Sequence, residues 1–398
     1  MFLAEDLREI YEELKKKKIT VPHIADINVK KKARTAFQET LLQQTVESAY
    51  KKVPYYGKIL KKLKLSSKDF TGIDDLRKMP LLSRQTLNDK LREFIDPIVD
   101  IISVRKTSGT TGPPLRIYVS REEMEALMYL GEITRVAGGL ISGEYALHIC
   151  VRRLPLVVSQ QTFTINHVWI KEDPLGTYLI IQNLLEKHLF SENKNQISVL
   201  ILPMPRLLRI LTREMRNAEV SPRSTGVRKI LVAGGYVSES LREEAKHRWN
   251  AEIWDTYSLT EVCGRASDCS SHHLHHFDIT MIPEVIDPHT KAPLGYDKEG
   301  LLALTTLHPF QQAMPLIRYV TDDLAILTDE KCECGYSGIS IKKIIGRISQ
   351  CIDLSDLLPK SIKTRWFSTN SMREILEKES SVLTKLDNVC SGSGIRQV

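Results

Sequence analysis

A dense run of hydroxyl residues and glycines, Thr107 to Pro114, is the segment of this 398-residue chain best suited to binding phosphate. It follows a β-like run, Ile101 to Arg105, and precedes a helical pattern, Arg121 to Ala137. Glycine lets a ligand approach the backbone closely, and N–H groups at a strand-to-helix junction bind anions. The Gly-Lys-Ser/Thr ending of an NTPase P-loop is missing, and a surface turn can have the same composition. The segment therefore predicts either a phosphate-binding loop or an ordinary turn.

A second candidate, Tyr257 to Glu261, combines an aromatic ring, a hydroxyl group and a carboxylate. Tyr257 can stack on a purine, Thr260 can bind a phosphate oxygen, and Glu261 can hold magnesium on the phosphates. A strand end with an incidental glutamate would explain the same residues. The pentapeptide alone leaves both interpretations open.

Two further segments offer groups for a nucleotide. Asp323, within Arg318 to Leu324, can bind ribose hydroxyls if it ends a strand, although a β-turn also favours Asp. Arg347, after Gly346, can neutralise phosphate charge, or it can be a surface residue at a strand end. Both therefore enter the list of candidate site residues.

The elements that must position these groups alternate between strands and helices. Residues 1–95 read as helices, and four later apolar runs read as buried strands separated by helical patterns: Tyr145–Val151, Ile197–Leu202, Val227–Val232 and Ala251–Tyr257. This alternation predicts an α/β fold with a mainly parallel sheet and helices on its faces. Such sheets bind ligands beyond the carboxyl ends of their strands, where 107–114, 233–236 and 257–261 all fall. The three candidate segments are therefore expected at the same edge of the sheet.

After Gly300 the pattern changes to strands, which predicts a smaller β-rich subdomain; the expected strands are Leu301–Leu307, Leu316–Val320, Leu324–Leu327 and Ile339–Ile345. Beyond Gln350 clear periodicity is lost. We therefore expect a helical N-terminal part (1–95) of the large domain, an α/β nucleotide- and acyl-binding core (96–299), a β-rich subdomain (300–347) and a short divergent tail (348–398).

Cysteine and histidine spacing predicts a metal site. Of seven cysteines, Cys269, Cys332 and Cys334 can join one imidazole from the His-rich segment 272–276 in a closed tetrahedral set suited to structural zinc. The spacing does not choose among the histidines. Unpaired buried thiols beside a His-rich surface loop are the alternative.

Composition narrows the class of protein. Hydrophobic residues make up 42% and charged residues 26%, with no apolar run long enough for a membrane span and no signal-peptide pattern, so we expect a cytoplasmic protein. The net charge of +7 reflects either solvated helix faces or attraction of a polyanion such as a nucleotide, coenzyme A or an acidic carrier protein. Basic runs without interleaved aromatics, and no reader motif, argue against nucleic-acid binding.

Taken together and in order, these motifs resemble the adenylate-forming superfamily of acyl-CoA ligases and adenylation domains, and most of all its phenylacetate–CoA ligase-like branch. The resemblance reaches from about Val46 to Arg347, and it includes the lead-in Ala49–Tyr56 and the segment Asp75–Pro80. It implies a large adenylate-forming N-terminal domain. It also implies ATP-dependent adenylation of an aromatic or small organic carboxylic acid. Transfer to a thiol of coenzyme A or of an acyl or peptidyl carrier protein would follow. A homodimer is compatible with the resemblance.

The resemblance also implies roles for residues of this chain. The phosphate-binding residues would be Ser108, Gly109, Thr110, Thr111 and Gly112, and the residues lining the adenine and acyl region would be Gly234, Gly235 and Tyr236. Tyr257 would stack on adenine and Asp323 would bind ribose. The catalytic residues would be Thr260 on the α-phosphate, Glu261 on Mg²⁺ and Arg347 near the phosphates. Alignment with the branch favours His275 as the zinc ligand beside Cys269, Cys332 and Cys334.

The chain departs from the family pattern at two places. After Arg347 the usual acidic hinge and mobile C-terminal domain are not recognisable, so no catalytic lysine can be named. The branch usually has an acidic residue at Gly235 and proline at Tyr236. The first departure motivates an alternative to the enzyme: a non-catalytic or partner-dependent degenerate ligase that binds nucleotide or a carrier protein within a biosynthetic complex. The second departure implies a reshaped acyl pocket.

Overall fold

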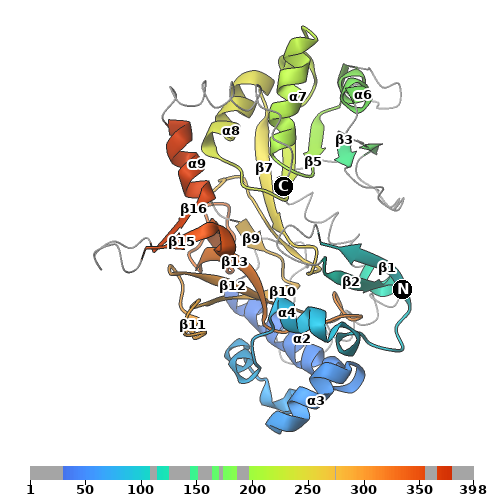
Figure 1. The fold of residues 1–398 in the computed structure, drawn as a ribbon, viewed down its shortest axis with the longest axis vertical. Coiled ribbons are helices and arrows are strands. Elements are labelled where there is room, and N and C mark those ends of the chain that lie inside the picture. Colours follow the sequence, from blue (N-terminus) through green and yellow to red (C-terminus); the bar gives the residue numbers. More distant parts are fainter. Residues whose placement is uncertain are drawn as a thin grey trace.

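One large mixed sheet organises the chain (Figure 1). The computed structural model describes residues 30–107, 114–124, 144–150, 164–169, 174–185, 197–273, 275–354 and 365–378. In these ranges the sheet has twelve strands in the order β11-β10-β12-β13-β14-β9-β8-β7-β6-β5-β3-β4. The α/β class is therefore confirmed.

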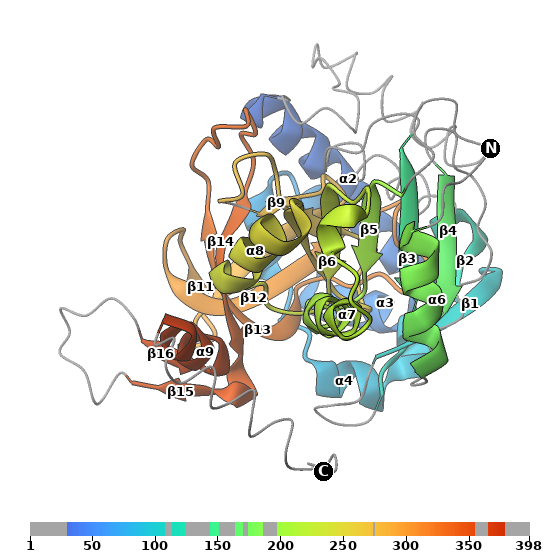
Figure 2. The ribbon, with the colours of Figure 1, turned by 90° about the horizontal axis from the view of Figure 1, so that it is seen from above.

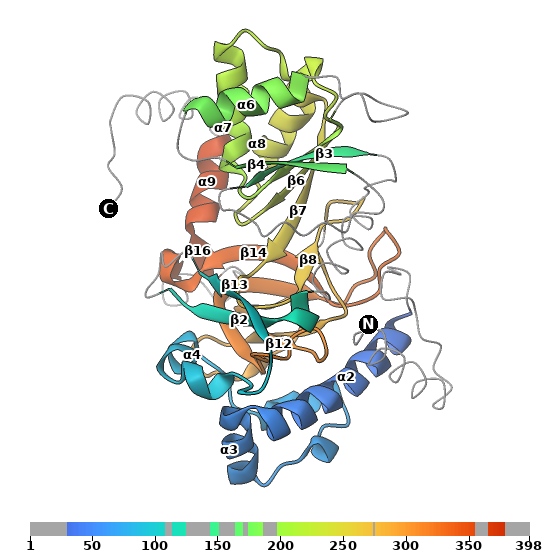
Figure 3. The same cartoon turned by 90° about the vertical axis from the view of Figure 1, so that its right-hand side faces the viewer.

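The first half of the sheet is parallel. It consists of β3 (Tyr145–Cys150), β4 (Thr164–Trp169), β5 (Val199–Leu202), β6 (Lys229–Ala233) and β7 (Glu252–Ser258). Figures 2 and 3 show three helices next to these strands: α6 (Pro174–Leu185), α7 (Arg206–Asn217) and α8 (Glu239–Glu244). A π-helical turn (Ala245–Trp249) extends α8. Leu200, Ile230 and Ile253 form a buried core with residues of these helices, which explains their continuous apolar runs.

The second half of the same sheet is antiparallel. It consists of β8 (Arg265–Ser267), β9 (His275–Phe277), β10 (Met281–Ile286), β11 (Pro293–Leu294), β12 (Glu299–Thr306), β13 (Tyr319–Thr328) and β14 (Ser340–Arg347). The strands expected after Gly300 are thus present, and they extend the parallel half through β8 and β9. The junction is β7, which pairs parallel with β6 and antiparallel with β8.

The N-terminal helices lie beneath the antiparallel half (Figure 1). They are α2 (Lys31–Lys52), α3 (Pro54–Leu63) and α4 (Arg84–Asp89), with short 3₁₀ turns at Ser67–Asp69, Ile73–Lys78 and Leu91–Phe94. Pro54 fits the first turn of α3 because it has no N–H to leave unbonded. Ser83 caps α4, its hydroxyl accepting the Thr86 N–H at 3.1 Å. Phe37 and Leu41 of α2 join Leu302 and Leu304 of β12 in one core.

Three smaller features complete the described chain. The hairpin of β1 (Ile101–Lys106) and β2 (Arg116–Ser120) frames the glycine-rich loop, and 3₁₀ turns occur at Pro222–Ser224 and Ile348–Gln350. The tail, where periodicity is weak, contains β15 (Cys351–Asp353), β16 (Trp366–Ser368) and α9 (Thr369–Lys378). Tertiary contacts support α9, since the Asn370 side chain donates to the Ile345 carbonyl at 3.2 Å. Among the described residues, no helix is long and apolar enough to cross a membrane.

Protonation of His308 is expected to weaken the fold. Burial lowers the pKa of His308 to about 4 from an ordinary 6.5. Between these values the unfolded chain binds a proton that the folded chain does not, so the free energy of unfolding falls as pH drops from 6.5 toward 4. A His308→Gln variant should lose less stability than the wild type between pH 7 and pH 5. Thermal unfolding at both pH values measures this, and equal losses would contradict it.

Candidate functional site

Glu261 lies at the centre of the site, just beyond the carboxyl end of β7. Its side chain is almost fully buried, and its Oε1 accepts hydrogen bonds from Arg84 Nη1 at 2.8 Å and from the Tyr319 hydroxyl at 3.2 Å. Burial, followed by the negative charge of Glu261, raises the pKa of Tyr319, so its hydroxyl remains a donor at neutral pH. The carboxylate is therefore fixed from two sides.

The backbone of the same segment is held by one amide side chain. Gln311 Oε1 accepts the Cys263 N–H at 2.8 Å, and Gln311 Nε2 donates to the Glu261 carbonyl at 3.1 Å. Both contacts are buried, so they hold the segment that carries Thr260 and Glu261 to the connection between β12 and β13.

Arg84 links Glu261 to the base of the glycine-rich loop. Its Nη2 donates to Thr107 Oγ1 at 2.7 Å, and this oxygen also accepts the Leu115 N–H at 2.9 Å. The Thr107 N–H bonds the Leu115 carbonyl at 3.0 Å, which closes the loop at its base. The predicted phosphate-binding residues Ser108, Gly109, Thr110, Thr111 and Gly112 lie outside the described residues.

The sequence did not single out Arg84, although one signal was available. Ser83 is the N-cap of α4, and Arg84 is the first residue of that helix. The positive end of the helix dipole disfavours a cation there. An arginine at this position therefore indicates an anionic partner elsewhere, which in the structure is Glu261.

Tyr257, Asp323 and Arg347 form a second group of contacts. The Tyr257 hydroxyl donates to Asp323 Oδ2 at 2.8 Å, and Arg347 Nε lies 3.6 Å from Asp323 Oδ1. Burial, followed by the charge of Asp323, raises the pKa of Tyr257, and burial also raises the pKa of Asp323. The structure thus brings together three predicted site residues from β7, β13 and β14.

The turn after β6 requires its glycines. Gly234 has φ +72°, and a Cβ there would lie 2.7 Å from the Pro203 carbonyl oxygen. A Cβ at Gly235 would lie 2.8 Å from Pro205 Cδ. The departure at Gly235 from the acidic residue of the branch therefore has a steric basis. Tyr236 follows and is half-buried.

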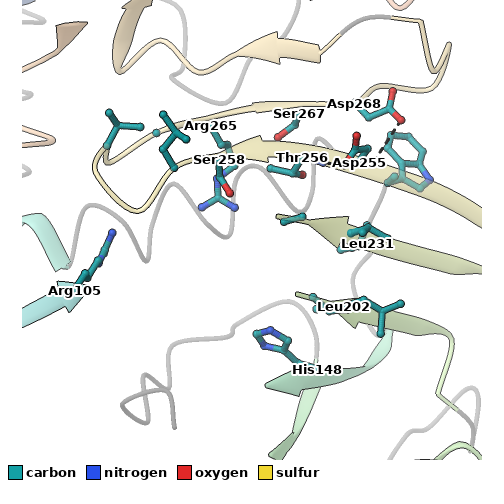
Figure 4. Close-up of a pocket in the computed structure, with 17 residues that line it drawn as sticks. Arg105, His148, Leu202, Leu231, Asp255, Thr256, Ser258, Arg265, Ser267 and Asp268 are labelled. Carbon is teal, nitrogen blue, oxygen red and sulfur yellow. Dashed lines mark hydrogen bonds between the residues drawn. The ribbon is translucent and has the colours of Figure 1, made fainter. Parts of the chain in front are cut away.

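A cavity of about 330 Å³ is lined mainly by residues of β5, β6, β7 and β8 (Figure 4). It touches Ala233, just before the glycine turn, and Leu259 and Val262, which flank Thr260 and Glu261. Its apolar wall comes from β5 and β6 and includes Ile201, Leu202, Leu231 and Val232. This volume is at the lower end of ordinary small-molecule sites.

Three thiols and one imidazole form a separate cluster. The ligand atoms of Cys269, His276, Cys332 and Cys334 all lie within 4.8 Å of one another. Cys269 Sγ is 3.7 Å from Cys332 Sγ, and His276 Nε2 is 3.2 Å from Cys334 Sγ. Two thiolates on a tetrahedral zinc ion would lie about 3.8 Å apart, so the donor set fits zinc.

The histidine of this cluster is His276, which corrects the prediction of His275. The two residues are consecutive in β9, so their side chains point to opposite faces of the sheet. His275 Nε2 is instead 3.0 Å from Asp255 Oδ2. His276 Nδ1 lies 2.8 Å from the Ser340 hydroxyl, and burial lowers the pKa of His276 to about 4, which keeps its ring neutral.

No protein-family model matches the chain. Among curated proteins, the chain is 26% identical over 323 residues to a phenylacetate–coenzyme A ligase of Thermus thermophilus, covering 78% of this chain and 70% of the relative. It is 24% identical over 312 residues to a phenylacetate–coenzyme A ligase of Escherichia coli, covering 73% and 67%. These relatives confirm the predicted resemblance to the phenylacetate–CoA ligase-like branch.

Solved structures of 2-hydroxyisobutyryl-CoA ligase share the fold at 16% identity. An open conformation in complex with 2-HIB-AMP and CoA has a TM-score of 0.70 and covers 82% of this chain and 78% of that one. A postadenylation state in complex with R3-HIB-AMP has a TM-score of 0.73 and covers 88% and 74%. The fold is therefore that of adenylate-forming acyl-CoA ligases.

Proposed function

We propose that this chain is an acid–thiol ligase that uses ATP to convert a carboxylic acid into an acyl-adenylate and then transfers the acyl group to a thiol. The observation that carries the proposal is that three predicted nucleotide-binding residues meet: the Tyr257 hydroxyl bonds Asp323, and Arg347 lies 3.6 Å from the same carboxylate. The similarity to phenylacetate–coenzyme A ligases supports it. The same similarity disfavours a non-catalytic binding module.

The residues would act by binding and charge stabilisation. Asp323 would accept hydrogen bonds from the ribose hydroxyls and Tyr257 would stack on adenine, while Thr260 and Arg347 would contact the phosphates. Mg²⁺ on Glu261, when bound, would draw negative charge from the phosphate oxygens. No general base is needed, because the attacking carboxylate is ionised at neutral pH. Electrostatic stabilisation at the α-phosphorus would then supply most of the rate.

The cavity lined by β5 to β8 would hold the acyl group. Its apolar wall suits an aryl or small organic acid, and the carboxylate would face Thr260. Coenzyme A is the acceptor we favour, since the 2-hydroxyisobutyryl-CoA ligase with the same fold binds it. A carrier protein as acceptor, and a homodimer, stay predictions. ATP and coenzyme A are cytoplasmic metabolites, which supports a cytoplasmic location.

Zinc would bind Cys269, His276, Cys332 and Cys334 as a structural ion. Cys269 lies between β8 and β9, His276 lies in β9, and Cys332 and Cys334 lie between β13 and β14. A closed set of four protein ligands leaves no position for substrate. The ion would therefore tie these segments together and take no part in the reaction.

The direct test is acid-dependent ATP–pyrophosphate exchange on the purified chain with magnesium, across aryl, amino and short fatty acids. Exchange with one acid class is expected, and coenzyme A should then yield the matching thioester. Background exchange with every acid would count against the proposal.

Asp323→Asn is expected to raise KM for ATP by about 10- to 100-fold, because a charged acceptor for two hydroxyl groups is lost. The loss should appear mainly in KM, since the ribose is remote from the reacting bond. Asp322→Asn is the matched control, because this neighbouring carboxylate is exposed. Equal KM values for the two variants would contradict the assignment.

A further inference from the structure

Arg265 lines the cavity from β8, the strand next to β7 (Figure 4). It lies directly opposite Ser258 in the pairing of β7 with β8, so the two side chains share one face of the sheet with about 5 Å between their Cβ atoms. The neighbouring pair, Tyr257 and Ala266, faces the other way and packs in the core. The alternation of the two strands therefore places Arg265 beside Ser258 in the cavity wall.

Arg105 lines the same end of the cavity from β1. Figure 4 shows Arg105, Ser258 and Arg265 toward one end of the cavity. Ser258 is two residues before Thr260, and Arg105 is two residues before Thr107 at the base of the glycine-rich loop. The arginine end is thus the end nearer to the proposed reaction centre.

Both arginines are accessible to a ligand. Each residue is half-buried and lines the cavity, and the side chain of Arg265 is 27% exposed. Arg265 Nε lies 4.0 Å from Asp278 Oδ2, which is too far for a hydrogen bond. Among the residues that the structure describes, neither guanidinium group donates a hydrogen bond. Their N–H groups are therefore available to an anion in the cavity.

The far end of the cavity offers no comparable charge. Figure 4 shows Asp255 and Asp268 there. Asp268 Oδ2 pairs with Arg242 Nη2 at 3.0 Å and lies 2.9 Å from His272 Nδ1, while Asp255 Oδ2 lies 3.0 Å from His275 Nε2. Between the two ends lies the apolar wall from β5 and β6. The least compensated charge of the lining is therefore positive, and it lies at the arginine end.

We propose that Arg265, together with Arg105, binds the carboxylate of the acid and holds it at the Thr260 end of the cavity. This inference rests on the proposed function, because it takes the ligand to be the acid that is adenylated. A guanidinium group matches a carboxylate with two parallel N–H bonds, which fixes the position and the direction of that group. The body of the acid then lies along the apolar wall, where a second charged group has no partner. The site is accordingly selective for acids with a single charged group.

Acids and their primary amides separate the carboxylate from the rest of the ligand. The probes are benzoate, phenylacetate and 3-phenylpropionate, each paired with its amide and titrated calorimetrically into the purified chain with magnesium and α,β-methylene-ATP, which cannot release pyrophosphate. At least one acid should bind about tenfold or more tightly than its amide, because hydrogen bonds to a charged group are worth about that much. Arg265→Gln should reduce this preference to about threefold or less, and Arg265→Lys should restore part of it.

Arg209→Gln is the matched control. Arg209 of α7 is also loosely paired, with its Nε 3.6 Å from Glu244 Oε2, but it does not line the cavity. This variant should keep the wild-type preference for acids. Arg105→Gln should weaken acid binding in the same direction as Arg265→Gln. Both cavity variants should keep the wild-type affinity for α,β-methylene-ATP and melt within a few degrees of the wild type, which separates a lost contact from a lost fold.

Two further readouts identify the group that the arginines hold. In acid-dependent exchange, Arg265→Gln should raise KM for the acid by about tenfold or more and leave KM for ATP and for pyrophosphate near the wild-type values. A second charge should be rejected, so the 4-carboxy derivative of the best acid should bind about tenfold or more weakly than the acid itself. Its neutral 4-carboxamide derivative, which has the same size, should lose less affinity.

The outcomes distinguish this inference from the proposed function. Equal binding of acids and amides, or a preference that Arg265→Gln and Arg105→Gln both retain, overturns the inference, whereas exchange would still support the ligase. A rise in KM for ATP or pyrophosphate in place of KM for the acid also overturns it, because the arginines then serve the phosphates. Binding of the 4-carboxy derivative as tightly as the acid contradicts selection for a single charge. An Arg265-dependent preference for acids without exchange supports the carboxylate site and contradicts the ligase assignment instead.

Discussion

Replacing Glu261 with glutamine is expected to lower acid-dependent ATP–pyrophosphate exchange by about 10²–10³-fold, because one electrostatic contact to the reacting phosphates is worth roughly that much. Glutamine keeps the shape of the side chain and removes the negative charge that would hold Mg²⁺. The loss should be in kcat and in the magnesium dependence. The assay is exchange across a magnesium titration with saturating acid.

The fold should survive this change. Glutamine can still accept hydrogen bonds from Arg84 and Tyr319 through its amide oxygen, so the melting temperature should fall by only a few degrees. Glu144→Gln is the matched control, because Glu144 is also buried and paired, with Arg228 and Lys229, just before the start of β3 at the opposite edge of the parallel strands. Exchange in this control should stay near that of the wild type. Undiminished exchange by Glu261→Gln would rule out its role in holding magnesium.

The second large effect is expected at the thiol cluster. Purified protein should contain one equivalent of zinc, and Cys332→Ser should remove it and lower the melting temperature on the order of 5–10 °C, because metal binding contributes directly to folding. Elemental analysis and calorimetry measure both quantities. A chelator should destabilise the wild type in the same direction.

Cys351→Ser is the control for this experiment. Cys351 is half-buried in β15 and does not belong to the cluster, so its variant should keep the zinc ion and the wild-type melting temperature. His276→Ala should lose the ion, whereas His275→Ala should retain it. Retention by His276→Ala with loss by His275→Ala would reverse the assignment made from the structure.

The sequence predicts four of the five parallel strands, because their apolar runs are bounded by turn residues; β4, in which polar and apolar residues are mixed, was not predicted. It separates Leu316–Val320 from Leu324–Leu327, whereas the structure joins them in β13. The reason is local: Asp322 has φ 65°, and the pairing with β12 shifts register at this point. Asp tolerates this conformation, and such a bulge redirects the neighbouring side chain. The interruption between Val320 and Leu324, which looks like a turn in the sequence, is therefore a β-bulge that orients the Asp323 side chain.

Candidate residues near one another in the sequence were easier to find than partners from distant elements. Tyr257 and Asp323 were both singled out, but their hydrogen bond depends on β7 and β13 approaching across the sheet. The sequence could not distinguish His275 from His276, because their side chains point to opposite faces of β9 and only the structure shows which face carries the thiols. Arg84 was missed because its partners, Thr107 and Glu261, are 23 and 177 residues away.

The ion pair between Arg84 and Glu261 bears on the order in which ligands arrive. A guanidinium group already occupies Oε1, one of the two carboxylate oxygens of Glu261, and balances the charge of the carboxylate. Hydrated magnesium by itself must compete with this internal cation, which makes its capture less favourable. A cation that arrives already chelated by a triphosphate brings negative charge that can engage the displaced arginine. The nucleotide would then act as the metal's carrier, and the empty enzyme would hold little of the ion.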